Sequence, residues 1–475
     1  MAITSTAQGA ARTPPTPGLG WAYAEPGKRD LRIDLLRGAA IFAMVVDHVG
    51  GQESWLYALT GGNHFFVSAA EAFIFLSGFV TGMIQAQVIA REGWKAAFAN
   101  TVQRACSLYF MAVLLALTLP LLALHLGLSW ANPLQTTSLP GYVVGVVTFQ
   151  QTYYLVDILV LYALLFPCAG LALKLISSGA SWLVITASWS LWLLWQYAPE
   201  ALSLPGSDTV FHFASWQVIF FTALVMGAHR KQVAAFFAQL PAGAYLTWSG
   251  ALFTASLLVY HSEQAVLSAV LPSRDAQSAA DALFSKADVG VGRLIVFAIL
   301  AAFAYSLLTI AWKPLKAILG WLLVPLGQHS LLAYCLHLFV VALFAAAGPS
   351  ILGPQPSSGE TALLQASGVI LVWLTVMTIA SFSPAKRPSV AKPAAKPAPA
   401  IAAPRPLPPA RQLPAPQTMR ARPLVTPRAP AMQPLTLAQR GLRPLPVAVP
   451  SVGQRTSTLS SRSSLAARQS LPAGR

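Results

Sequence analysis

Two ionisable side chains lie in one long apolar segment near the amino terminus. Arg37 and His48 are eleven residues apart, so in a helix they fall on one face after three turns and about 20°. At a rise of about 1.5 Å per residue, this spacing separates them by about 16 Å along the helix axis. Asp34 lies one turn before Arg37, and we expect these two side chains to form an ion pair.

An imidazole and a guanidinium at opposite ends of one helix suit two different tasks. Imidazole is the side chain whose unperturbed pKa already lies near neutral, so His48 is a candidate general base toward a hydroxyl group. Asp47, Glu71 or Asp157 could orient it. Arg37 is suited to an anionic ligand. The alternative for Arg37 is a side chain that only extends to the lipid headgroups.

Other polar side chains open further apolar segments. Glu71 opens the second segment and Asp157 the fourth, and the sixth begins His212-Phe-Ala-Ser-Trp216-Gln217. Ionisable groups inside membrane spans are costly and usually functional. We expect Asp47, His48, Glu71 and Asp157 to lie at one depth and to surround one polar cavity, with His337 nearer the middle of the ninth segment. Glu71 and Asp157 could equally reach the water interface, and His48 alone could be a satisfied histidine at a helix end.

These residues must be positioned by helices that cross a bilayer. The chain is 55% hydrophobic and only 10% charged, against roughly 25% charge in an ordinary soluble domain. Because a spanning helix needs about 20 mostly apolar residues, the sequence predicts an all-α, polytopic membrane bundle of about ten helices. The predicted spans are 31–49, 66–90, 103–126, 153–176, 181–197, 212–229, 243–261, 291–312, 328–347 and 363–382. The stretches 141–150 and 315–327 could be re-entrant or interfacial pieces.

The loops between the predicted spans alternate in charge. Basic residues precede the first span and lie in the second, sixth and eighth loops, for example Arg91 and Lys95, or Arg230 and Lys231. The first, fifth and ninth loops carry acids without bases, and the long loop 262–290 is mixed but mostly acidic. Since Lys and Arg are retained on the cytoplasmic side, both termini are predicted to be cytoplasmic, in a multi-pass protein of a bacterial inner membrane.

Three segments divide the chain: a flexible stretch 1–28, a membrane domain 29–383 and a tail 384–475. The tail holds 15 of the 31 Lys and Arg, no acid, and 19 prolines among its 92 residues. This composition predicts disorder, with contacts to anionic lipids or to an unknown partner. Because the basic charge belongs to the tail, no nucleic-acid partner is expected. The three cysteines lie in apolar runs and show no disulfide or metal spacing.

Five motifs in this order resemble the OpgC family, a branch of the integral membrane acyltransferase superfamily. The motifs are Arg37-x10-His48, Glu71-Ala-Phe-Ile-Phe-Leu-Ser77-Gly78-Phe, Asp157-Ile-Leu-Val-Leu-Tyr162, Phe213-Ala-Ser-Trp216-Gln217 and Leu326-Gly-Gln-His329-Ser330 through His337. The resemblance implies transfer of an acyl group, succinyl in the best-known case, from cytoplasmic acyl-CoA to hydroxyls of a periplasmic glucan. It implies His48 as catalytic and Arg37 as its companion.

The expected site therefore has two parts. The expected catalytic residues are His48, Arg37, Asp47, Glu71 and Asp157. The expected donor- or acceptor-binding residues are Asp34, Ser77, Trp216, Gln217 and His337. Acyl-CoA is expected as a co-substrate, with no permanently bound cofactor and no metal.

Two other classes of function fit parts of the sequence. A proton-coupled transporter or flippase could use the same buried Asp, Glu and His groups as a relay. Many transporters contain paired halves with interrupted helices, and this sequence shows no internal repeat. A receptor or scaffold that works through its tail would leave the buried charges unexplained.

Overall fold

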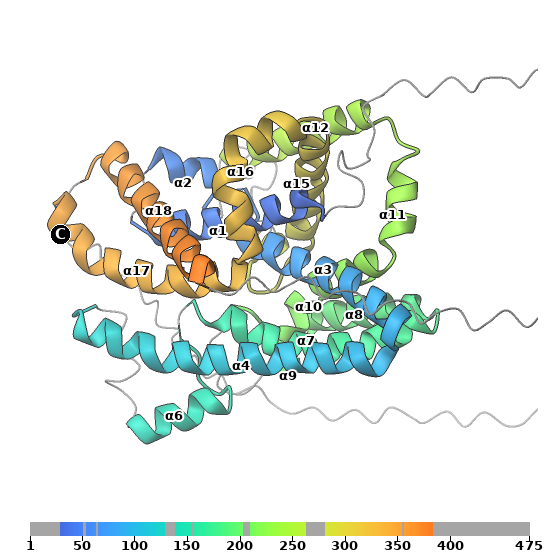
Figure 1. The fold of residues 1–475 in the computed structure, drawn as a ribbon, viewed down its shortest axis with the longest axis horizontal. Helices are drawn as coiled ribbons and strands as arrows, with labels where there is room; N and C mark the ends of the chain where they lie inside the picture. The colour runs from blue at the N-terminus through green and yellow to red at the C-terminus, as the bar shows by residue number, and fades with distance from the viewer. Residues whose placement is uncertain are drawn as a thin grey trace, which may run out of the picture. The chain divides into compact units, whose positions relative to one another are not determined.

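The computed structural model describes residues 29–50, 54–62, 65–128, 138–153, 155–202, 210–262, 281–353 and 356–382. The predicted flexible segment 1–28 and the predicted disordered tail 384–475 lie outside these residues. Every described regular element is an α-helix (Figure 1). The helices are α1 (Leu31–His48), α2 (Trp55–Thr60), α3 (Ala69–Glu92), α4 (Trp94–His125), α6 (Leu139–Val147), α7 (Asp157–Ser177), α8 (Ser181–Tyr197), α9 (Pro199–Leu202), α10 (Phe213–Ala228), α11 (Arg230–Phe237), α12 (Ala242–His261), α15 (Val291–Ile310), α16 (Trp312–Gln328), α17 (Ser330–Leu352) and α18 (Ser358–Phe382).

Seven of these helices are long and apolar enough to cross a membrane, within the described part of the chain. They are α3, α4, α7, α12, α15, α17 and α18. Each of the ten predicted spans corresponds to a helix, but α1 carries four charged residues, and α8 and α10 have only 17 and 16 residues. The chain is thus a multi-pass membrane protein whose described part is all-helical, and the count of ten spans stays a prediction.

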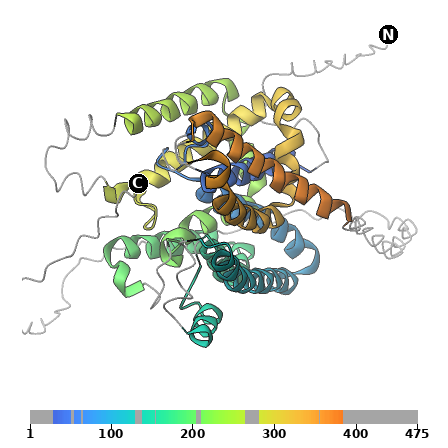
Figure 2. The same ribbon diagram turned by 90° about the vertical axis from the view of Figure 1, so that its left-hand side faces the viewer.

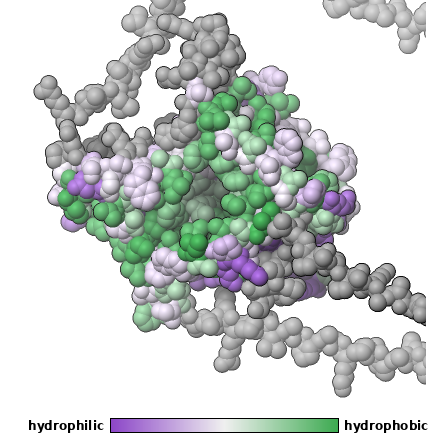
Figure 3. Space-filling view, turned by 90° about the horizontal axis from the view of Figure 1, so that it is seen from above, coloured by the Kyte–Doolittle hydropathy of each residue, from purple (hydrophilic) through white to green (hydrophobic). Residues whose placement is uncertain are grey.

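The two uncertain stretches also form helices. Residues 141–150 overlap α6, a nine-residue helix, and residues 315–327 lie within α16. Large apolar side chains stay exposed on the long helices, such as Phe110 on α4 and Leu363 on α18. Figure 3 shows apolar side chains over much of one face, with polar ones gathered toward its edges. Such a surface is suited to lipid rather than to water.

Three helix pairs make the most extensive contacts: α1 with α16, α3 with α10, and α4 with α7. The α1–α16 contact depends on Gly38 and Gly327. A Cβ added at Gly38 would lie 1.8 Å from the carbonyl oxygen of Leu323, and one at Gly327 would lie 1.7 Å from that of Asp34. Helix backbones approach this closely only where small residues remove the side chain.

The carboxyl-terminal helices α17 and α18 pack against α1. Helix α18 contacts α1, α17 and α16, and Figure 2 shows α18 in orange crossing the part of the bundle that contains α1 in blue. Helix α17 contacts α1 and α4 as well as α18. The first predicted span is therefore enclosed by helices that are about 300 residues away in the chain.

Candidate active site

His48 is the last residue of α1 and its ring meets a second imidazole. Its Nδ1 atom lies 3.2 Å from Nε2 of His337 on α17. The two rings are stacked, with centroids 5.5 Å apart and planes 22° apart. His337 is fully buried, and its Nδ1 atom hydrogen-bonds the backbone carbonyl of Tyr334. His48 is only half-buried, so a substrate can reach it more easily than it can reach His337.

Asp47, the neighbour of His48, belongs to a different contact. The hydroxyl of Thr60, at the end of α2, donates a 2.8 Å hydrogen bond to Asp47 Oδ1. Ser54, the N-cap residue of α2, donates its hydroxyl hydrogen to the side-chain carbonyl of Gln365 on α18. The short helix α2 thus holds Asp47 through Thr60, and the closest described partner of the His48 ring is His337.

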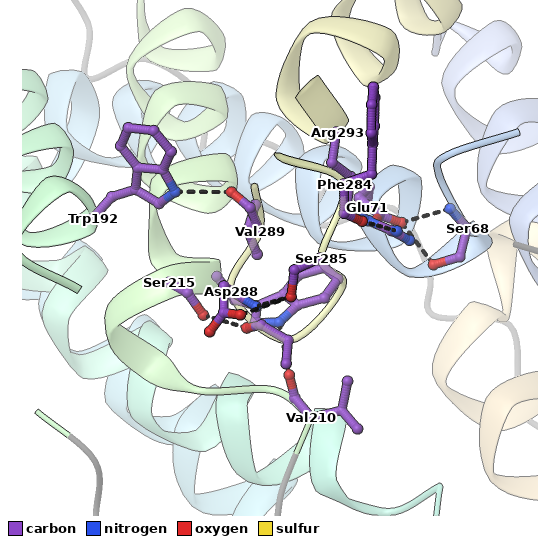
Figure 4. Close-up of polar contacts among 12 residues, drawn as sticks. Ser68, Glu71, Trp192, Val210, Ser215, Phe284, Ser285, Asp288, Val289 and Arg293 are labelled. Atoms are coloured by element: carbon purple, nitrogen blue, oxygen red, sulfur yellow. Dashed lines mark hydrogen bonds and ion pairs between the residues drawn. The ribbon is translucent and has the colours of Figure 1, made fainter. Parts of the chain in front are cut away.

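Glu71 has both carboxylate oxygens occupied. Oε2 accepts hydrogen bonds from the backbone N–H and the hydroxyl of Ser68, at 2.8 and 2.7 Å, which forms a capping box at the start of α3. Oε1 forms an ion pair with the guanidinium of Arg293 on α15 (Figure 4). Both side chains of this pair are buried. Glu71 therefore joins two helices and satisfies a helix end.

Trp216 and Gln217 also make contacts that fix helices. Trp216 Nε1 donates to the carbonyl of Val210 at 3.0 Å. Gln217 accepts from the Ser188 hydroxyl at 2.6 Å and donates to the Ser188 carbonyl at 2.8 Å. Both side chains are fully buried. This geometry joins α10 to α8, and the described contacts of both residues are with protein groups.

The segment 284–289, between α12 and α15, is held firmly beside the site. Ser215 donates to the carbonyl of Ala287 at 2.8 Å, and Trp192 donates to that of Val289 at 2.9 Å (Figure 4). Asp288 accepts from Ser285 at 2.7 Å and from Trp195 at 3.0 Å. These bonds fix the backbone on both sides of Lys286.

Lys286 carries a charge that interacts with three of the predicted site carboxylates. Burial lowers the pKa of its ammonium, while Glu71, Asp157 and Asp47 raise that pKa and Arg293 lowers it. The three acids thus act on one cation. The sequence analysis missed Lys286 because it lies in a long loop that is mostly acidic. It also passed over Arg293, although a charge in the first turn of an apolar helix is a recognisable signal.

At the other end of α1, Arg37 does not form the predicted ion pair with Asp34. Arg37 Nη2 donates a 2.5 Å hydrogen bond to the hydroxyl of Ser330 on α17, and Asp34 instead pairs with Arg29 Nη2 at 2.5 Å. Arg29 precedes α1 and its side chain folds back onto the first turn. Among the described residues, the buried Nε of Arg37 has no hydrogen-bond partner.

Arg37 lines a cavity of about 310 Å³ between α1, α3, α4, α7 and α17. A second guanidinium, that of Arg104, lines the same cavity, together with Ser77 and Tyr162, whose hydroxyl donates to that of Ser77 at 3.2 Å. The remaining polar lining residues are Thr81, Gln85, Asn100, Thr101 and Ser330. Two cations and no acid in the lining make this cavity suitable for an anionic ligand.

The predicted site residues therefore fall into four groups. Arg37 and Ser77 share the cationic cavity, and Asp34 is not among the residues that line it. His48 and His337 contact each other, and the charges of Asp47, Asp157 and Glu71 all raise the pKa of Lys286. Trp216 holds the segment before α10, and Gln217 joins α10 to α8. Among the described residues, no three His, Cys, Asp or Glu side chains lie together as a metal ion would require.

The family of the chain follows from a match to a known protein family. The family model described as OpgC protein matches residues 29–383, which cover the whole helical bundle. The chain belongs to the OpgC family. No curated protein and no solved structure matches the chain.

Membership of the OpgC family indicates a membrane acyltransferase that modifies glucans. The matched residues begin just before α1 and end just after α18. Both the cationic cavity and the pair of imidazoles thus lie in the part of the chain that this OpgC protein shares with its family.

Proposed function

We propose that this OpgC protein transfers an acyl group, succinyl in the first instance, from cytoplasmic acyl-CoA to a hydroxyl of a periplasmic glucan. One observation carries the proposal: a single helix, α1, presents Arg37 to a cationic cavity and ends in the accessible imidazole of His48. The basic loops support a cytoplasmic location for the cavity end, in an inner membrane with both termini inside.

The donor fits the cationic end. Coenzyme A carries phosphates, and charge-assisted hydrogen bonds from guanidinium groups are the strong contacts for phosphate oxygens. Arg37 and Arg104 line one cavity, so they can share this anion. The unpartnered Nε of Arg37 is a further donor on that side chain. The flexible arm of the coenzyme would then bridge the roughly 16 Å between Arg37 and His48.

The transfer itself needs a base near the acceptor. His48 removes the proton from a glucan hydroxyl while the oxygen attacks the thioester carbonyl. The tetrahedral intermediate collapses, the carbon–sulfur bond breaks, and the leaving thiolate takes the proton back from the imidazolium. The products are an acyl ester on the glucan and free coenzyme A thiol, with no net change in protons. Acyl-CoA is consumed in each turnover and is not a resident cofactor.

The first test is chemical: mass analysis of periplasmic and surface glycans from cells with and without the protein. An acyl increment present only with the protein supports the proposal and also identifies the acyl group. Identical glycans in both samples, with the protein present in the membrane, would refute it.

The second test separates the two ends of α1 on purified variants. His48→Ala is expected to depress turnover by about 10²–10⁴-fold, the scale of general-base loss, with acyl-CoA binding nearly unchanged. Arg37→Ala is expected to weaken acyl-CoA binding, and Arg37→Lys to restore it only in part, because a point charge cannot reproduce a bidentate contact. The exposed His125 provides the control His125→Ala. Full transfer by His48→Ala would exclude the catalytic role.

A further inference from the structure

The contact between His48 and His337 determines which nitrogens of both rings carry a proton. Nδ1 of His337 hydrogen-bonds the carbonyl oxygen of Tyr334. A carbonyl oxygen only accepts, so this Nδ1 carries a hydrogen. His337 is fully buried, and neither of its described partners, the imidazole of His48 and a backbone carbonyl, is an anion. A cation there would be uncompensated, which costs several kcal/mol, so His337 is neutral and its Nε2 has a lone pair.

The same reasoning extends to His48. The hydrogen bond of 3.2 Å between Nδ1 of His48 and Nε2 of His337 needs one proton. Since Nε2 of His337 has none, Nδ1 of His48 carries it. A neutral His48 then has its lone pair on Nε2, the nitrogen on the far side of the ring from His337.

We propose that His337 is a positioning residue that holds His48 in the Nδ1–H tautomer, so that Nε2 is the atom that accepts the proton of the substrate hydroxyl. This inference rests on the proposed function. His337 would act as the acid does in a Ser-His-Asp triad: it accepts a hydrogen bond from the base, fixes its orientation and stays bonded to the imidazolium that forms. A neutral imidazole takes the place of the carboxylate.

Neighbouring contacts explain why His337 is suited to this role. Tyr334 lies one turn before His337, and its hydroxyl donates to the carbonyl of Leu155, just before α7. The Tyr334 ring also packs edge-on against the His337 ring, with centroids 4.9 Å apart. The acid nearest in sequence to His48, Asp47, is bonded to Thr60. His337 is thus anchored in α17.

The test combines two substitutions with a direct measurement of the tautomer. Gln can place its side-chain oxygen near the position of Nε2 of His337, whereas Leu has a similar bulk and no acceptor. His337→Leu is expected to lower kcat by about 10²-fold or more, with KM for acyl-CoA nearly unchanged. His337→Gln should recover part of this loss. Equal activity of the Leu variant and the wild type would overturn the proposal.

Ring-¹⁵N-labelled histidine in the wild-type protein gives a readout that needs no activity. The signals that disappear in His48→Gln belong to His48. A protonated Nδ1 and an unprotonated Nε2 are expected for them, and His337→Leu should change this pattern. A protonated Nε2 in the wild type would overturn the proposal. If the tautomer is as expected but the wild type transfers no acyl group, the proposed function fails and the positioning of His48 stands.

Discussion

Glu71 and Arg293 form an ion pair that joins α3 to α15, with 0% and 4% of their side chains exposed. Removing one partner of a buried pair leaves an uncompensated charge, which costs about 3–5 kcal/mol, whereas replacing both by apolar residues is often neutral. We therefore expect Arg293→Met to lower the unfolding temperature strongly. The double variant Glu71→Met/Arg293→Met should recover much of it. Thermal unfolding in detergent measures both.

This comparison also tests the predicted catalytic role of Glu71. A double variant that is stable and still transfers acyl groups would make Glu71 a structural residue. A double variant that is stable but inactive would support a catalytic role for Glu71.

The cationic cavity predicts a second donor-binding arginine. Arg104→Ala is expected to weaken acyl-CoA binding by about 10–100-fold, since a hydrogen bond to a charged group contributes about 1.5–3 kcal/mol. The control is Arg91→Ala, which removes an exposed arginine at the end of α3. Equilibrium binding of a non-hydrolysable acyl-CoA analogue measures the effect. Equal affinity in both variants would contradict the donor assignment of the cavity.

The buried hydroxyl of Tyr142 is expected to make the unfolding temperature fall at alkaline pH. Burial in α6 raises the pKa of its hydroxyl from 10.0 to about 12, and this hydroxyl donates to the carbonyl of Ala116 at 2.9 Å. Between pH 10 and about 12 the Tyr142 hydroxyl keeps its proton in the folded chain and loses it in the unfolded chain. The buried hydroxyl therefore contributes fully to the free energy of unfolding below pH 10, and this contribution is lost as the pH rises toward about 12. Tyr142→Phe should reduce the alkaline decline in unfolding temperature.

The alternating loop charges predict opposite sides for Lys231 and Glu360. Lys231 lies in α11, just after α10, and Glu360 lies in the first turn of α18. Single cysteines at these positions should react with a membrane-impermeant thiol reagent from opposite faces of the membrane. Labelling of both from the same face would remove the predicted orientation of α1.

The tail is predicted to be dispensable for the chemistry. It begins after α18 and has the composition of a chain that buries little apolar surface. A truncation after Ser383 should retain glycan acylation at equal protein abundance. Loss of activity at normal abundance would show that the tail is required for acyl transfer.

The sequence predicted the elements better than it predicted their partners. Its hydrophobic segments correspond to helices, and α1 runs without a break from Leu31 to His48, as the spacing of Arg37 and His48 requires. The contact between His48 and His337 could not be predicted from the sequence, because the two residues are 289 positions apart. Local periodicity does not indicate which helices pack together. The predicted pairing of Asp34 failed for a related reason: it counted residues within the helix, and Arg29 lies outside it.

The glycine contacts limit how this bundle can move. Gly38 and Gly327 bring the backbones of α1 and α16 together, and a Cβ at Gly78 or Gly227 would lie 2.3 Å or 2.0 Å from a carbonyl oxygen across the α3–α10 contact. Surfaces that interlock in this way resist sliding. A conformational cycle of the alternating-access kind must therefore carry α1 together with α16, and α3 together with α10, as two rigid bodies. Any hinge would have to lie between these two pairs, where α1 contacts α3.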